Sequence, residues 1–283
     1  MNWKGFASRL LLITVAFPVL GALIFVLPQL HHLAFNAGVT AACVVGAFET
    51  RGLFQARGVP CARYLAPVLA GSLPLVTWFE VAGLIPAGWT RAWLPLAIGM
   101  ILVRATVMKD TRQLAGFLPF VSSSVFTLLY PAFFLAWVVR FSALGEPSLS
   151  ILFFLCLVFG NDMAAYFAGS LFGGTTRLNL AISPGKTAVG FAAGIFGTLV
   201  VYTIFRFAAP FLLPSSVPLG VVTMVILGVA VIIGDLVESG LKRSANVKDS
   251  GIIIPGRGGI LDSVDSMVLS APLFYGLMRL FGR

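Results

Sequence analysis

Half of the acidic residues of this chain lie in one short segment. The sequence has ten Asp and Glu residues among 283, and five of them fall between positions 235 and 265. The chain is 59% hydrophobic and only 10% charged. Ionisable groups are costly in so apolar a chain, so this segment is where we look first for chemistry. The five residues are Asp235, Glu238, Asp249, Asp262 and Asp265.

The two ends of this segment repeat one spacing, which places side chains on a shared helix face. Residues three and four positions apart lie on the same side of an α-helix. Asp235 and Asp262 each begin such a series, so we expect two acidic helix ends that face each other from the same side of a membrane. The first series is Asp235, Glu238, Ser239 and Lys242, and the second is Asp262, Asp265 and Ser266.

Carboxylates at two facing helix ends are suitable ligands for Mg²⁺, which prefers oxygen ligands and completes its shell with water and substrate phosphates. Basic residues and a glycine-rich stretch lie between the two ends and would bind the remaining phosphate charge. The direct prediction is a metal-assisted phosphoryl or nucleotidyl transfer site. A network of salt bridges joining two helices is the alternative explanation. The intervening residues are Arg243, Lys248, Asp249, Arg257, Gly258 and Gly259.

A second polar segment, residues 161–190, is expected to contribute to substrate binding. Asp162 interrupts an apolar run, and an ionisable group at that depth is expensive unless it faces protein, ion or water. Further on, Ser183, Lys186 and Thr187 come just before the next apolar stretch. A helix N-terminus with free N–H groups, hydroxyls and a lysine can bind phosphate oxygens. Ser-Pro before a helix is equally well explained as a start signal.

Long apolar stretches must position these two segments. The mean hydropathy is +1.00, and crossing a hydrocarbon core of about 30 Å takes roughly 20 residues of helix. Spans in lipid must satisfy their own backbone polar groups, and the alternation typical of barrel strands is missing from the sequence. We therefore predict an all-α, polytopic integral membrane protein with about nine transmembrane helices. The predicted spans are 10–28, 33–48, 66–86, 92–108, 117–140, 149–170, 187–208, 217–236 and 262–281.

Basic residues are distributed unequally between the spans. If the N-terminus lies inside, 14 of the 19 Lys and Arg residues fall on the inner side. Positive charge marks cytoplasmic loops, so we predict a multi-pass protein of the cell inner (plasma) membrane with its active site on the cytoplasmic side. The formal charge of +9 is mostly a sign of this topology. Nucleic-acid binding is not expected, because the sequence contains no Lys/Arg-rich run with interleaved aromatics.

The two halves of the chain differ in character. We predict a single membrane domain over 1–283, because the sequence shows no internal repeat and no low-complexity linker. Residues 1–148 are apolar helices joined by short basic loops, and we interpret them as a scaffold that reveals little about function. Residues 149–283 carry both polar segments, and we interpret them as catalytic helices and cytoplasmic loops.

The two polar segments together form an extended motif. Its later part is the run Ser239-x-x-Lys242-Arg243-x4-Lys248-Asp249-x5-Pro255-Gly256-Arg257-Gly258-Gly259-x-x-Asp262-Ser263-x-Asp265. Its earlier part consists of Asp162, Ala165-Tyr166, Gly169, Phe172-Gly173 and Ser183-Pro184-x-Lys186-Thr187-x-x-Gly190. This pattern resembles the signature of the CDP-diacylglycerol synthases, which are the phosphatidate cytidylyltransferases. The resemblance covers the C-terminal part of the chain, from Asp162 onward.

The resemblance implies a nine-helix enzyme of phospholipid biosynthesis that joins CTP to phosphatidate with Mg²⁺ and gives CDP-diacylglycerol and pyrophosphate. Its metal-binding acids would be Asp235 and Asp262, with Asp265 close by, and Lys242 would bind phosphate. The predicted catalytic residues are Asp235, Lys242 and Asp262. The residues predicted to bind substrate are Asp162, Ser183, Lys186, Thr187, Glu238, Ser239, Arg243, Lys248, Asp249, Arg257, Gly258 and Gly259.

The sequence departs from the family pattern in three places. Arg257 stands where the signature has His, Ser263 stands where it has Arg, and Ala188-Val189 replaces Trp-Glu. The first two exchanges together move one positive charge, and we hypothesise that they compensate each other. The lost Glu at position 189 has no visible replacement in the sequence. These departures bear on the identity of the substrate.

The expected partners are CTP, phosphatidate or a related anionic lipid, and the bilayer, with a homodimer left open. A CTP-dependent lipid-alcohol kinase or a CDP-lipid synthase for another lipid would share the metal site at the helix ends. A more distant alternative is a membrane transporter that uses the intramembrane Asp162. Transport predicts inverted repeats and broken helices in both halves, and the front half has no counterpart to the acidic segment.

Overall fold

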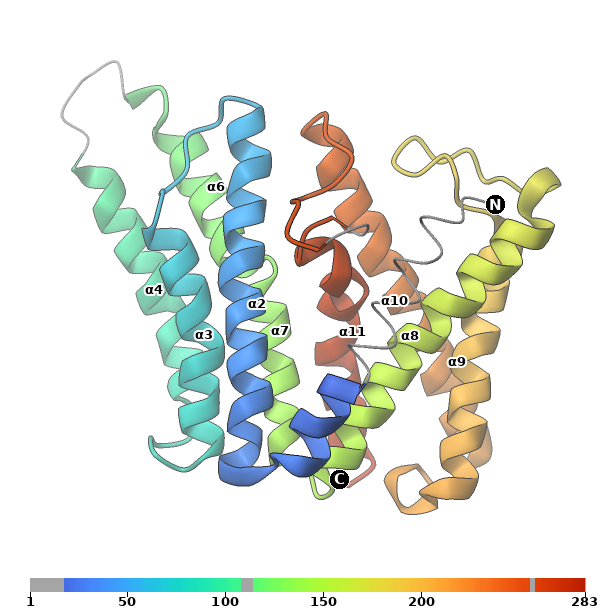
Figure 1. Cartoon of the computed structure of the whole chain (residues 1–283). Coiled ribbons are helices and arrows are strands. Elements are labelled where there is room, and N and C mark those ends of the chain that lie inside the picture. The colour runs from blue at the N-terminus through green and yellow to red at the C-terminus, as the bar shows by residue number, and fades with distance from the viewer. Residues whose placement is uncertain (1–17, 108–113, 255–257, 283) are drawn as a thin grey trace. The chain divides into compact units, whose positions relative to one another are not determined.

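The computed structural model describes residues 18–107, 114–254 and 258–282. All regular elements within these ranges are helices, joined by turns and a few isolated β-bridges (Figure 1). The prediction of an all-α chain is therefore confirmed. The helices are η1 (Ala22–Val26), α2 (Gln29–Ala56), α3 (Leu65–Val81), α4 (Trp89–Thr106), α6 (Phe117–Leu129), α7 (Ala132–Arg140), η2 (Phe141–Ala143), α8 (Pro147–Phe172), η3 (Gly173–Thr175), α9 (Ala188–Ala208), η4 (Pro210–Leu212), α10 (Val217–Ser244) and α11 (Leu261–Leu280).

Five helical segments in the described part of the chain are long and apolar enough to cross a membrane. They are α2, the segment Phe117–Ala143, α8, α9 and α10. A polytopic membrane protein is therefore confirmed, whereas the number nine stays a prediction. The predicted first span, 10–28, falls largely on residues outside the described ranges. The second is longer than predicted, because α2 continues past position 48 to Ala56.

The predicted span 117–140 consists of two helices. α6 ends at Leu129 and α7 begins at Ala132, with Tyr130 in an extended conformation (φ −106°, ψ 114°) and Pro131 between them. Proline has no N–H to donate and disfavours a helical conformation at the residue before it. The break follows from Pro131, so this boundary could have been read from the sequence.

The described residues form two compact units. The first comprises the described residues up to Ser142 together with those of 244–264, and the second comprises Ala143–Arg243 with the described residues from Asp265 onward. In the first unit, α2 packs against α3, α6 and α7. Hydrogen bonds between helices and loops strengthen this packing, since Ser123 Oγ donates to Pro60 O at 2.6 Å and Ser124 Oγ accepts from Ala62 N at 2.9 Å.

The second unit is held together by aromatic packing between α8, α9 and α11. Phe153 of α8 lies 4.5 Å from Phe205 of α9 and 5.8 Å from Phe274 of α11, measured between ring centroids. Phe153 and Phe274 are both almost fully buried. Aromatic pairs at these separations stabilise a core beyond the burial of their area alone. This core joins α8, α9 and α11.

Candidate functional site

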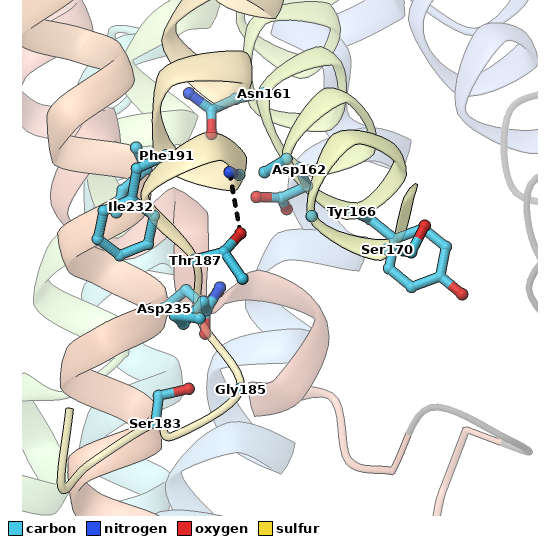
Figure 2. Close-up of a pocket in the computed structure, with 14 residues that line it drawn as sticks. Asn161, Asp162, Tyr166, Ser170, Ser183, Gly185, Thr187, Phe191, Ile232 and Asp235 are labelled. Atoms are coloured by element: carbon cyan, nitrogen blue, oxygen red, sulfur yellow. Dashed lines mark hydrogen bonds and ion pairs between the residues drawn. The ribbon is translucent and has the colours of Figure 1, made fainter. Parts of the chain in front are cut away.

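A pocket of about 470 Å³ opens in the second unit, lined by residues of α8, α9, α10 and the loop before α9 (Figure 2). A pocket of this size fits a small-molecule ligand. Its walls carry four of the residues that the sequence analysis selected for substrate binding and one predicted metal ligand. These five are Asp162, Ser183, Lys186, Thr187 and Asp235.

Asn161 anchors the helices that form the inner wall of the pocket. Its Nδ2 donates to Thr198 Oγ1 of α9 at 2.9 Å and to Gly228 O of α10 at 3.2 Å. The residue is 1% exposed. A buried amide that joins three helices is a specific link, because an apolar replacement would leave polar partners without hydrogen bonds. Asn161 therefore sets the position of the neighbouring Asp162 on α8.

The loop before α9 folds back on itself as a narrow hairpin and brings Lys186 to the pocket. Leu178 N donates to Lys186 O at 2.9 Å, and Ala188 N donates to Thr176 O at 2.8 Å. Thr187 is the N-cap of α9, since its Oγ1 accepts from Gly190 N at 3.0 Å. Helix α9 thus begins where the motif predicted, directly after Thr187.

Lys186 forms an ion pair with the carboxylate of Asp235 on α10. The two side chains are 30% and 24% exposed, so the pair is accessible from the pocket. Ser239 Oγ, one turn further along α10, lies 3.4 Å from Asp235 Oδ1. A lysine beside a carboxylate at a pocket wall can bind phosphate oxygens with the ammonium and a cation with the carboxylate. The sequence predicted both residues but not their pairing.

The predicted acidic face of α10 is formed as expected, because the helix continues to Ser244. Glu238 is fully buried and forms an ion pair with Lys242, one turn away on the same helix. Glu238 and Lys242 were both predicted to contact substrate, and in the structure they bind each other. Arg243, at the end of the helix, is exposed.

Two further carboxylates of the second unit lie close to Asp235. Asp162 Oδ1 accepts from Ser266 Oγ at 3.2 Å, and Asp265 interacts electrostatically with both Asp235 and Asp162. Asp265 is 8% exposed. Residues from α8, α10 and α11 thus concentrate negative charge in one region. In the ranges that the structure describes, however, no three His, Cys, Asp or Glu side chains converge closely enough to enclose a metal ion.

The remaining motif residues belong to the first unit. Asp262 Oδ2 accepts from Ser250 N at 2.8 Å, from Ser250 Oγ at 2.7 Å and from Gly259 N at 2.8 Å. Asp262 therefore orders the loop before α11. Its sharing of a metal ion with Asp235 stays a prediction, as each belongs to a different unit.

The glycines of the motif shape this loop. Gly258 has φ +112°, a conformation that L side chains rarely adopt, and it exchanges two backbone hydrogen bonds with Ile254. Gly259 donates its N–H to Asp262. Both N–H groups are thus engaged within the loop, and phosphate binding by either glycine stays a prediction.

The other predicted residues of this loop have few described contacts. Lys248 and Asp249 are exposed, which suits residues predicted to bind substrate. Arg257 lies outside the described residues. Ser263, at the position where the motif has arginine, places its Oγ 3.3 Å from Gly259 O. The serine lies in the first turn of α11, and its hydroxyl donates back to the loop before the helix.

Glu49, near the end of α2, also belongs to this cluster, and it was not among the residues predicted from the sequence. Its carboxylate is close to Ser250 and to the start of α11, and the residue is only 8% exposed. The sequence could have indicated Glu49, because it is one of few acidic residues among residues 1–148 and directly follows an apolar stretch. An ionisable residue in such a place calls for a partner or a function.

The fold and the pocket together define a polytopic helical membrane protein with paired charges at its helix ends. The chain belongs to the cytidylyltransferase family, whose family model matches residues 7–281. The family that the motif indicated is therefore confirmed.

Several similar proteins bear the name phosphatidate cytidylyltransferase. The protein from Bacillus subtilis (strain 168) is 37% identical over 188 residues, which cover 65% of this chain and 66% of the relative. Phosphatidate cytidylyltransferase 5, chloroplastic, from Arabidopsis thaliana is 31% identical, with 88% of this chain and 66% of the relative covered. The protein from Synechocystis sp. is 29% identical, with 90% and 91% covered. The matches to the first two relatives span just under two thirds of those relatives' length.

Proposed function

We propose that this protein is a phosphatidate cytidylyltransferase that joins CTP and phosphatidate to give CDP-diacylglycerol and pyrophosphate. The observation that carries the proposal is the pocket of the second unit, where one lysine and two carboxylates line a cavity in a member of the cytidylyltransferase family. The names of the relatives support the choice of lipid substrate. The proposed place of action is the cell inner membrane, with the pocket on the cytoplasmic side where CTP is available.

The proposed reaction is an in-line displacement at phosphorus. An anionic oxygen of the phosphatidate phosphate attacks the α-phosphorus of CTP, the bond from this phosphorus to the bridging oxygen breaks, and pyrophosphate leaves with the electron pair. Because the nucleophile is already an anion, the protein needs to align two charged substrates and offset their repulsion. Lys186, which lines the pocket, would bind a phosphate oxygen. Thr187 and Ser183 offer hydroxyl groups on the same wall.

The proposed cofactor is Mg²⁺, and the chemistry of the second unit fits it. Asp235 and Asp265 would hold the ion, with Asp162 nearby, because these three acids concentrate negative charge that a divalent cation would offset. When bound, Mg²⁺ would neutralise charge on the triphosphate. Metal binding by Asp262 is a separate hypothesis, which the variant Asp262→Asn tests.

The proposed roles of the outlying residues follow from their exposure. Lys248, Asp249 and Arg243 are exposed, so we propose that they contact the nucleotide or the lipid phosphate. Lys242 is proposed to act on phosphate in spite of its ion pair with Glu238, because a second anion can share an ammonium group with three donors.

The test uses purified protein in detergent with radiolabelled CTP, Mg²⁺ and a lipid panel of phosphatidate, an isoprenoid phosphate and a lipid alcohol. A labelled CDP-lipid formed from phosphatidate is the expected product, with release of pyrophosphate. A CDP-lipid formed only from another lipid phosphate would refute the substrate, and phosphorylation of the lipid alcohol would refute the reaction. Protein inactivated by Asp235→Asn serves as the matched control, because the variant differs by a single charge.

A further inference from the structure

Glu49 of α2 binds the N-terminal end of α11 through its carboxylate. Ile260 N donates to Glu49 Oε1 at 3.0 Å, and Leu261 N donates to Oε2 at 2.8 Å. Helix α11 begins at Leu261, so these two N–H groups lie at a helix N-terminus, where backbone donors lack partners within the helix. A carboxylate is favoured there by the helix dipole as well as by hydrogen bonding. An acid more than 200 positions earlier in the chain therefore completes the start of α11.

Ser250 connects the two carboxylates of this cluster. Its Oγ lies 3.3 Å from Glu49 Oε2 and 2.7 Å from Asp262 Oδ2, and its backbone N–H donates to Asp262. Glu49 and Asp262 thus bind the loop from two sides. Between Ser250 and Leu261, four described backbone N–H groups are accepted by one or other of these acids. They are those of Ser250, Gly259, Ile260 and Leu261.

The packing at Gly259 shows how closely the loop approaches Glu49. A Cβ atom at this position would lie 2.5 Å from both carboxylate oxygens of Glu49 and from Ser250 Oγ. Real Cβ atoms essentially never approach other atoms this closely. A side chain at position 259 would therefore displace the Glu49 carboxylate or the Ser250 hydroxyl, which ties a residue of the predicted scaffold to the motif itself.

We propose that Glu49 is a positioning residue that holds the described parts of the motif loop, residues 248–254 and 258–262, in the conformation that binds the nucleotide and lipid phosphates. This proposal rests on the proposed function, because it deepens the role of the motif loop. Glu49 does not contact the reacting atoms in this scheme. It acts by accepting the N–H groups at the start of α11, so that Lys248 and Asp249 are presented from an ordered loop.

Glu49→Gln is the main test variant, because it keeps the side-chain length and removes one acceptor oxygen and the charge. The matched control is Glu80→Gln in the same unit. Glu80 also accepts several hydrogen bonds, from Thr90 N at 2.8 Å, Thr90 Oγ1 at 2.7 Å and Arg140 Nη2 at 3.4 Å, and it also lies near the end of its helix, α3. A general loss of stability would follow from either variant, whereas loss of loop order would follow only from the first.

Hydrogen–deuterium exchange of the full-length protein in detergent, without substrate, measures the loop directly. Glu49→Gln is expected to raise exchange in peptides covering 248–262 by about tenfold to a hundredfold, since hydrogen bonds to charged groups are among the stronger ones. Glu80→Gln is expected to leave these peptides unchanged. Ser250→Ala, a milder variant, is expected to raise exchange in the same peptides by a smaller factor. Unchanged exchange in both Glu49→Gln and Ser250→Ala, or an equal rise in Glu80→Gln, would overturn the proposal.

Steady-state kinetics supply the second readout. Glu49→Gln is expected to raise KM for CTP by about tenfold or more with a smaller effect on kcat, and Glu49→Asp to recover part of the loss because it restores the charge. A fall in kcat alone would contradict a positioning role. If the wild-type protein makes no CDP-lipid, the proposed function fails, and the exchange experiment still decides whether Glu49 orders the loop.

Discussion

Asp235→Asn separates the contribution of this carboxylate to folding from its contribution to turnover. In the structure Asp235 forms an ion pair with Lys186, and the two side chains are 24% and 30% exposed. Partly exposed pairs of this kind are worth about 0.2–1 kcal/mol, because water screens them. Asparagine has nearly the same size and keeps one oxygen acceptor. We therefore expect the free energy of unfolding to fall by about 1 kcal/mol or less.

The expected loss of activity is much larger. Removing one group that stabilises charge in a transition state typically costs about 10²–10³ in kcat, or about 2.7–4 kcal/mol. Asp235 would supply both a metal ligand and the partner of Lys186, so we expect a loss at or above the upper end of this range. The assay is formation of labelled CDP-lipid from CTP and phosphatidate at saturating Mg²⁺. Each variant is compared at equal amounts of folded protein, measured by size-exclusion chromatography in detergent.

Lys186→Met completes the test as the partner variant. If the ion pair mattered only for folding, Asp235→Asn and Lys186→Met would each lower activity only in proportion to the folded protein recovered. If Lys186 and Asp235 act on substrate, each single variant is nearly inactive and the double variant is no worse than the poorer single. Near-normal turnover by Asp235→Asn at full recovery of folded protein would refute the reasoning.

Three further variants test individual parts of the structure. Asp262→Asn is expected to insert normally and to lose turnover, and wild-type activity in the CTP assay would remove Asp262 from the predicted catalytic set. Thr187→Ala removes the side chain that accepts from Gly190 N at the start of α9, and it is expected to lower the free energy of unfolding by about 1 kcal/mol, as measured by thermal unfolding in detergent. Gly259→Ala brings a Cβ against Glu49 and is expected to cost about 1–3 kcal/mol of stability and to raise exchange in the motif loop; unchanged unfolding would show that the loop can move aside.

Much of the helical organisation could be predicted from the sequence. The spacing of Asp235 and Lys242 predicted a shared face if the helix continues past the predicted span 217–236, and α10 does continue to Ser244. The start of α9 after Thr187 followed from the change from polar to apolar residues. The break at Pro131 was missed, although proline between two apolar stretches is a local signal.

Several residues that line the pocket were selected from the sequence, but their contacts were not. Lys186 and Asp235 were both selected from the sequence, but their ion pair joins positions 49 residues apart in the chain. The pairing of Glu238 with Lys242 is a local contact, and it could have been expected from their separation of four residues. The spacing of a motif predicts which polar residues lie at helix ends. It does not predict which of these residues contact one another.

The sequence by itself determined the all-α membrane class, the family and most of the polar residues of the site, since each depends on composition or on spacing along a single helix. Only the tertiary structure decided that Glu49 of α2 binds the motif loop and that Asn161 joins α8, α9 and α10. The physical reason is that a buried hydrogen bond depends on where distant segments meet. Glu49 and Leu261 are 212 positions apart, and no local pattern in the chain encodes that their atoms lie 2.8 Å from each other.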